Sequence, residues 1–164
     1  MSGARATVPA MSKDFEFVYG KWNILNRKLV DPIDPDCDEW IEFPTTSDVY
    51  PILDGHGHIE HIYGPEAPTP FEGFTLRLFD PTEDLWRIWW SATSNPGVLD
   101  VPVTGRFEGT HGTFESDDVL GGRPARVRFE WLAENPAAPV WQQSFSFDGG
   151  TTFRRNWVME FTPR

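Results

Sequence analysis

The segment 71–91, FEGFTLRLFDPTEDLWRIWWS, most constrains what this chain can fold into. In its first arm apolar side chains alternate with Thr75 and Arg77, and the apolar positions are Phe74, Leu76 and Leu78. In its second arm large apolar side chains again recur at every second position, namely Trp86, Ile88 and Trp90. Alternation of this kind is typical of β-strands, and the intervening DPTED at 80–84 has the composition of a turn. The segment therefore predicts an aromatic-rich β-hairpin that forms a wall of the core.

The same design recurs along the rest of the chain. Further alternating segments lie at about 21–30, 40–50, 58–63, 101–108, 113–119, 125–132, 141–147 and 154–161, and turn or loop residues separate them. Many short strands at this spacing indicate a sandwich or an up-and-down barrel. We favour closure, because no strand carries the charges that usually protect a free sheet edge. The expected fold is all-β, a single antiparallel up-and-down barrel of about ten strands.

The length of 164 residues is that of one domain, which we place at 14–164. Residues 14–20, DFEFVYG, are too few for an independent helix and end in Gly, which predicts one helical turn. We expect this turn to pack Phe15 and Val18 under the barrel. Residues 1–10 lack the apolar segment of a signal peptide, and residues 1–13 are expected to be a disordered lead-in.

Charge and cysteine content exclude several partners. The formal net charge is -11 and no Lys/Arg run occurs, so nucleic acid and anionic membrane are not expected partners. No apolar run approaches the roughly 18 residues of a membrane-spanning helix. Cys37 is the only cysteine, which indicates a reducing compartment and a cytoplasmic location. The oligomeric state stays open, with a homodimer among the options.

Two features resemble the calycin superfamily. Gly20-Lys21-Trp22 opens the first predicted strand, and Arg154 and Arg155 lie on the last. In lipocalins a Gly-x-Trp opens the first strand, and its Trp closes the barrel floor beneath an Arg or Lys from the final strand. The resemblance implies that Trp22 and either Arg154 or Arg155 take those places.

The chain resembles more closely a bacterial family of uncharacterised calycin-like barrel proteins. The segments that carry this likeness are FVYGKW at 17–22, TLRLFDP at 75–81 and FSFDGGTTF at 145–153, and the match extends from about residue 14 to the C-terminus. This family has no reaction that could be carried over to the present chain. The resemblance implies a barrel whose open end admits a small, largely apolar molecule, and some small barrels of this kind act as cyclases or isomerases in biosynthesis.

Three of the four histidines cluster in His56-Gly-His58-Ile-Glu60-His61. On a strand, positions 56 and 58 share a face while 61 points the other way. A metal site would therefore need a bulge, or His111 from another strand. We interpret these residues as hydrogen-bonded rim histidines and expect no metal. A haem- or metal-binding barrel that uses the 56–61 cluster is kept as an alternative.

Other motifs point to turns rather than to chemistry. The segment 146–153 resembles a single Asp-box of the sialidase propellers, a hairpin-turn device, and we expect it to fix a turn. No Gly-x-Ser-x-Gly elbow, phosphate loop or dinucleotide fingerprint occurs, so neither nucleophilic catalysis nor a cofactor is expected.

The candidate ligand-binding residues lie on predicted inner faces. The large rings expected there are Trp86, Trp90, Trp131, Trp141 and Trp157. Such rings pack a core, and they also line pockets for flat or polyene-like molecules. Gln143 and Arg155 are polar residues on otherwise apolar faces, so each needs either an internal partner or a ligand. His58 and His61, near one barrel mouth, are the candidate acid or base residues.

The preferred hypothesis is a barrel that binds a small, largely hydrophobic organic molecule, as a cofactor-independent cyclase or isomerase. Its candidate catalytic residues are His58, His61 and Arg155, which would polarise one oxygen of a held conformer. One alternative is a carrier without chemistry. Another is a partner-binding module whose core is filled and has no pocket.

Overall fold

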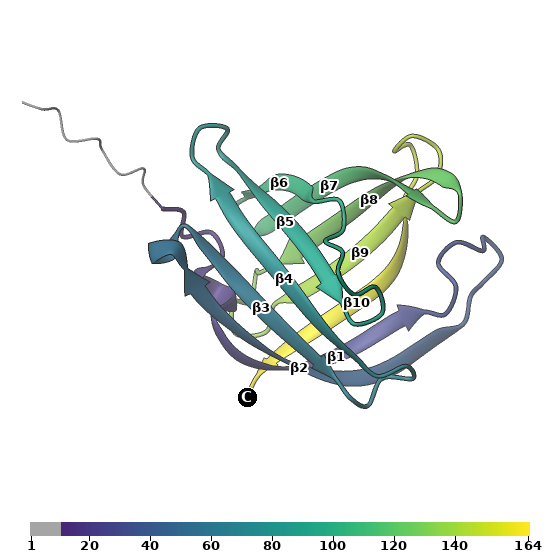
Figure 1. The fold of residues 1–164 in the computed structure, drawn as a ribbon, viewed down its shortest axis with the longest axis horizontal. Coiled ribbons are helices and arrows are strands. Elements are labelled where there is room, and N and C mark those ends of the chain that lie inside the picture. The colour runs from purple at the N-terminus through teal and green to yellow at the C-terminus, as the bar shows by residue number, and fades with distance from the viewer. Residues whose placement is uncertain (1–10) are drawn as a thin grey trace, which may run out of the picture.

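The structure is a computed structural model that describes residues 11–164. These residues form a closed antiparallel barrel of ten strands (Figure 1). The strands are β1 (Gly20–Leu29), β2 (Trp40–Ile52), β3 (Gly57–Gly64), β4 (Phe71–Asp80), β5 (Leu85–Ala92), β6 (Val103–Glu108), β7 (His111–Leu120), β8 (Arg123–Leu132), β9 (Val140–Ser146) and β10 (Arg154–Pro163). The prediction of an all-β, up-and-down barrel is confirmed. The expected lead-in at 1–13 lies mostly outside the described residues.

Each strand pairs with its neighbours in the sequence, and β1 closes the barrel by pairing with both β2 and β10. Within residues 11–164 every strand has a neighbour on both sides, although β5 and β6 pair at only three positions, Trp86–Ile88 with Val103–Gly105. Closure agrees with the absence of edge-protecting charges. Among residues 11–164 no helix is long and apolar enough to cross a lipid bilayer.

One end of the barrel is closed by the short 3-10 turn η1 (Glu16–Val18). Phe15 and Val18 are almost completely buried there, as predicted. The indole Nε1 of Trp22, at the start of β1, donates a hydrogen bond to the carbonyl oxygen of Val18 over 2.7 Å. This bond ties the turn to the first strand and satisfies a carbonyl at the end of the turn.

The other end carries the longer connections. Because consecutive strands run in opposite directions, the connections β1–β2, β3–β4, β5–β6, β7–β8 and β9–β10 all lie at the end opposite η1. In Figure 1 η1 lies at the left, and the long β1–β2 connection extends at the right. We call this second end the open end.

The core fills the half of the barrel next to η1. Phe15 lies 4.8 Å from the Trp86 ring and 4.9 Å from the Phe107 ring, both edge to face, and Phe114 is fully buried beside it. Edge-to-face pairs contribute about 0.5–1.5 kcal/mol each beyond the area they bury. The closed half is therefore a packed aromatic core.

Candidate ligand site in the barrel interior

The five predicted inner-face tryptophans all point into the barrel, but they divide along its axis. Trp86 and Trp131 are 1% exposed and belong to the packed half. Trp141 is 8% exposed, and Trp90 and Trp157 are only half-buried. The rings of Trp141 and Trp157 meet edge to face at 5.5 Å, and those of Trp90 and Trp157 at 6.5 Å. Trp90 and Trp157, which lie nearest the open end, thus line a space, whereas Trp141 pairs with Trp131 and belongs to the core.

That space is a cavity of about 380 Å³, which we call the mouth cavity. Its lining comes from two opposite sides of the barrel and from the connections above them, namely Lys28, Thr69, Pro70, Phe71, Trp90, Ala92, Thr93, Ser94 and Trp157. Since β1 and β10 face β4 and β5 across it, the cavity lies inside the barrel rather than on its outer wall. Its volume falls within the usual range for small-molecule sites, roughly 300–1,000 Å³.

Lys28 supplies a positive charge to this cavity. Its Nζ lies 4.2 Å from the centroid of the Trp157 ring, a cation–π contact. Burial lowers the pKa of this amine from its usual value of 10.5. The Trp157 ring is held in turn, because its Nε1 donates to Oδ1 of the fully buried Asn26 over 3.0 Å.

Gln143 lies on the inner face near the open end, as expected from its place between Trp141 and Phe145. Its side-chain amide donates to Oδ1 of Asn156 over 2.8 Å. This contact is the internal hydrogen bond that was the alternative to a ligand-facing role. Gln143 does not line the mouth cavity.

A buried polar cluster lies deeper in the barrel. Arg77 donates to Oε1 of Glu60 over 2.6 Å and to Nε2 of His58 over 3.1 Å. The side chains of Arg77 and Glu60 are 4% and 1% exposed. The Arg77 guanidinium also lies 5.2 Å from the Phe15 ring and 5.2 Å from the Trp131 ring. We call these three residues, His58, Glu60 and Arg77, the inner triad.

The contacts of His58 determine its protonation. Arg77 can only donate, so Nε2 of His58 accepts and its proton lies on Nδ1. Burial and the charge of Arg77 lower the pKa of His58 to about 2, which keeps the ring neutral at physiological pH. A ring so weakly basic is a poor general base. Contrary to the expected position near a barrel mouth, His58 lies beside η1, 4.9 Å from the Phe15 ring.

A second, smaller cavity of about 30 Å³ adjoins the inner triad. We call it the inner cavity, and its lining residues are Glu60, Ile62, Thr75, Arg77, Ile88, Phe129, Trp131, Trp141, Met159 and Phe161. Several buried polar atoms of these residues have no hydrogen-bond partner within 11–164: Oε2 of Glu60, Nε of Arg77 and Nε1 of Trp131. The space has room for one or two water-sized groups.

Sequence reasoning missed Arg77, Thr75 and Glu60 as interior residues. In β4 the polar set faces inward and is buried, while Phe74, Leu76 and Leu78 lie on the outer face. The register explains this, because Thr75 pairs with Trp90 and Arg77 pairs with Ile88. Residues directly opposite share a face, so the four-residue turn between Asp80 and Leu85 places odd-numbered residues of β4 beside even-numbered residues of β5. The length of the turn between β4 and β5 was the feature of the sequence that could have predicted this inner face.

Two candidate catalytic residues lie outside the barrel. His61 faces the outer surface, beside Tyr50, Tyr63 and Phe74. Arg155 was expected on the inner face with Trp157, but it is exposed and contacts Gln142 at 3.5 Å. A β-bulge between Arg155 and Trp157 is the reason, since the extra residue reverses the faces on either side of it.

Neither arginine stacks on Trp22, so this expectation from the calycin resemblance is wrong. Trp22 pairs with Pro163 at the far end of β10, whereas Arg154 and Arg155 begin that strand at the open end. Trp22 itself is buried beside Phe161, with ring centroids 5.9 Å apart. The closed end therefore has its buried tryptophan, but neither Arg154 nor Arg155 lies over it.

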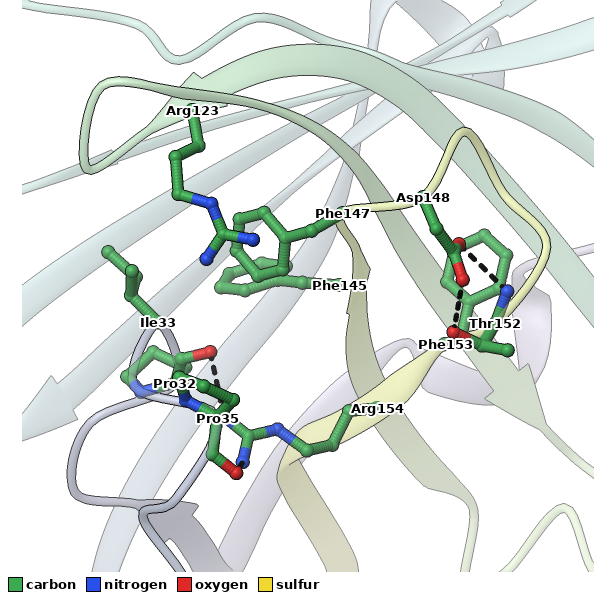
Figure 2. A pocket seen from close by; sticks show the side chains of 10 residues that line it. All are labelled: Pro32, Ile33, Pro35, Arg123, Phe145, Phe147, Asp148, Thr152, Phe153 and Arg154. Carbon is green, nitrogen blue, oxygen red and sulfur yellow. Dashed lines mark hydrogen bonds between the residues drawn. The ribbon is translucent and has the colours of Figure 1, made fainter.

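Arg154 instead holds the β1–β2 connection. Its guanidinium donates to the carbonyl oxygens of Pro32, Asp34, Pro35 and Cys37 over 2.8–3.2 Å. Figure 2 shows the bonds to Pro32 and Pro35, which lie beside a hollow of about 370 Å³ that Phe145 and Phe147 also line. Four carbonyl acceptors occupy the guanidinium, so we assign Arg154 a structural role.

The Asp-box resemblance correctly predicted a turn. Asp148 accepts hydrogen bonds from the Thr152 backbone over 2.9 Å, the Thr152 hydroxyl over 2.5 Å and the Ser146 hydroxyl over 2.7 Å. These bonds lower the pKa of Asp148 to about 2, those from Thr152 having the largest effect. Figure 2 shows the Thr152 bonds at the tip of the β9–β10 connection.

The histidines do not converge on one point. His58 lies inside the barrel, His61 outside, and His56 in the β2–β3 connection. His111 bonds to Glu130 over 2.7 Å on the surface. Within residues 11–164 no three His, Cys, Asp or Glu side chains are grouped so as to hold a metal ion. The 56–61 cluster is thus not assembled as a metal site.

Comparison with models of known protein families and with curated proteins finds no match to this chain. A functional assignment therefore has to come from the fold and from the interior of the barrel.

Proposed function

We propose that the protein binds a small, flat, largely hydrophobic organic molecule in the mouth cavity. The observation that carries this proposal is the pair Trp90 and Trp157, two half-buried indoles from opposite sides of the barrel that border one cavity of about 380 Å³. Half-buried rings on a concave wall gain apolar contact when a flat ligand covers their exposed surfaces and excludes water from them.

Lys28 favours a ligand that carries a hydrogen-bond acceptor. Its ammonium group lies against Trp157 and lines the same cavity. A ligand that carries an acceptor oxygen near its outer end gains a charge-assisted hydrogen bond from this group. The expected ligand therefore has a flat apolar body and an oxygen at the end that faces the opening.

The matched pair Trp89 and Trp90 provides the test. These residues are adjacent on β5 and point to opposite faces, and Trp89 pairs with Leu76 on the outer side. We would titrate the protein with the fluorescent probe N-phenyl-1-naphthylamine. Trp90→Leu should weaken binding about tenfold or more, by loss of stacking area, and Trp89→Leu should leave it unchanged. No saturable binding, or equal effects of the two substitutions, contradicts the proposal.

A second candidate function is cofactor-independent cyclisation or isomerisation in the same barrel. The observation that favours it is Glu60, whose Oε2 has no partner among the described residues and borders the inner cavity. This second oxygen of Glu60 is open to a proton donor of the ligand, whereas Nε2 of His58 already accepts from Arg77. Native mass spectrometry of the purified protein gives any retained compound, and its conversion by wild type but not by Glu60→Gln would support catalysis. Unchanged compound after prolonged incubation supports a carrier.

We also propose that the chain is a calycin-like barrel of the cytoplasm. The Gly20-Lys21-Trp22 opening, with Trp22 buried at the closed end, supports the first part. The single free Cys37 supports the second. Fractionation of cells that express the untagged chain tests the location.

A further inference from the structure

We propose that the inner cavity binds a neutral hydroxyl group, an alcohol or phenol, at the deep end of the ligand. This inference rests on the proposed function and specifies the chemistry of its ligand. It follows from the unpartnered atoms, the charge balance and the place of the inner cavity in the barrel.

The unpartnered atoms around the inner cavity include both donors and an acceptor. In the described part of the chain, Oε2 of Glu60 accepts no hydrogen bond, and Nε of Arg77 and Nε1 of Trp131 donate none. All three residues line the cavity, and all are more than nine-tenths buried. Buried polar groups without partners are strongly disfavoured. A group that both donates and accepts, placed in this cavity, satisfies atoms of each kind.

The charges around the inner cavity cancel. Arg77 is positive and its partner Glu60 negative, while the low pKa of His58 keeps that ring neutral. A carboxylate entering the cavity would meet Oε2 of Glu60, and an ammonium would meet Arg77. Each would be buried as an uncompensated charge, which is costly in a medium of low dielectric. A neutral hydroxyl avoids this cost.

The inner cavity lies one inner-face position below the mouth cavity. On β5, Trp90 borders the mouth cavity and Ile88 the inner one, and on β10 the corresponding residues are Trp157 and Met159. Two residues of a strand span about 6.6 Å. The rings of Trp90 and Trp157 meet edge to face at 6.5 Å, so a ligand ring that stacks on one of them has to part the pair. The far end of a two-ring ligand in this position can reach the inner cavity.

The inner cavity accepts a small group and no more. Its volume of about 30 Å³ gives room for one or two water-sized groups. A hydroxyl oxygen fits this volume, whereas an aromatic ring does not. The rings of the ligand must then stay at the level of the tryptophans.

We would measure the binding of three probes of matched shape by quenching of tryptophan fluorescence. They are 4-hydroxybiphenyl, 4-methylbiphenyl and biphenyl-4-carboxylate. Wild type should bind the hydroxyl probe about tenfold more tightly than the other two, as expected for hydrogen bonds to charged groups. Trp131→Phe removes one donor but keeps a ring, and should weaken binding of the hydroxyl probe alone.

Glu60→Gln should change the preference of the site. It removes the negative charge and leaves Arg77 uncompensated, so the carboxylate probe should become the tightest ligand. Ser47→Ala is the matched control, because the Ser47 hydroxyl is also buried without a partner in residues 11–164 but lines neither cavity. Circular dichroism verifies that each variant folds, and Trp131→Phe decides the matter if Glu60→Gln does not fold.

The outcomes separate the two proposals. If none of the three probes binds wild type, the proposed function fails and this inference fails with it. If all bind equally and Trp90→Leu weakens them all, the mouth cavity is a ligand site and the hydroxyl inference is wrong. Tightest binding of the carboxylate probe to wild type also overturns the inference.

Discussion

Removing one partner of the buried Arg77–Glu60 ion pair should destabilise the barrel strongly. The guanidinium lies 5.2 Å from each of two aromatic rings, and its hydrogen bond to Glu60 is 2.6 Å long. Either Arg77→Met or Glu60→Leu leaves the other charge buried at 4% exposure or less. Breaking a buried pair in this way costs about 3–5 kcal/mol.

Replacing both partners has a different expected effect. In the double variant Arg77→Met/Glu60→Leu no buried charge remains, and a packed apolar pair is often as stable as the ion pair it replaces. We therefore expect the double variant to recover most of the loss, within about 1–2 kcal/mol of wild type. The coupling energy of the cycle is then at least about 3 kcal/mol.

Urea unfolding monitored by tryptophan fluorescence measures these differences, with the midpoint temperature as a second readout. At about 2–4 °C for each kcal/mol in a domain of this size, the single variants should melt roughly 6–20 °C below wild type. The exposed pair Arg27–Glu160, at 3.3 Å with side chains 43% and 48% exposed, is the control. Breaking it should cost less than about 1 kcal/mol.

Two results would refute this reasoning. Single variants within about 1 kcal/mol of wild type would mean that water reaches and screens the Arg77–Glu60 pair. A double variant no more stable than the less stable single variant would mean that packing around Phe15 and Trp131, rather than charge, sets the cost.

Two further predictions concern pH and the open end. Because the folded-state pKa of His58 is about 2, below its usual 6.5, its contribution to stability is complete above pH 6.5 and is lost as pH falls toward 2. Between pH 6.5 and 4.5 wild type should lose about 2 kcal/mol more than His58→Gln, because the unfolded chain gains a proton on His58 that the folded chain does not. His61→Gln, which changes a ring on the outer face, is the matched control. Equal slopes in urea titrations for wild type and His58→Gln would contradict this. Arg154→Ala should release the β1–β2 connection and speed amide hydrogen exchange at 31–39, with no change in β4; unchanged exchange there would show that the four carbonyl contacts do not hold it.

The sequence by itself determined the barrel. Period-two alternation fixes strands, and the frequent Gly and Pro turns fix short connections, so an up-and-down order follows from local chemistry. The inner-face positions of Trp86, Trp90, Trp131, Trp141 and Trp157 also followed, because large rings in strands that bound one core must face it. The turn at 146–153 was equally local.

The tertiary structure alone decided which polar residues reach the interior. Arg77 and Glu60 lie on strands whose outer faces are also rich in apolar residues, so alternation could not choose the inner set, and only the cross-strand register did. The bulge beside Asn156 moved Arg155 outward, since one extra residue reverses the face of all that precede it. Whether the tryptophans fill a core or border a cavity depends on how far η1 and the preceding residue Phe15 reach into the barrel. That depth depends on the packing of the entire barrel and cannot be predicted from any single strand.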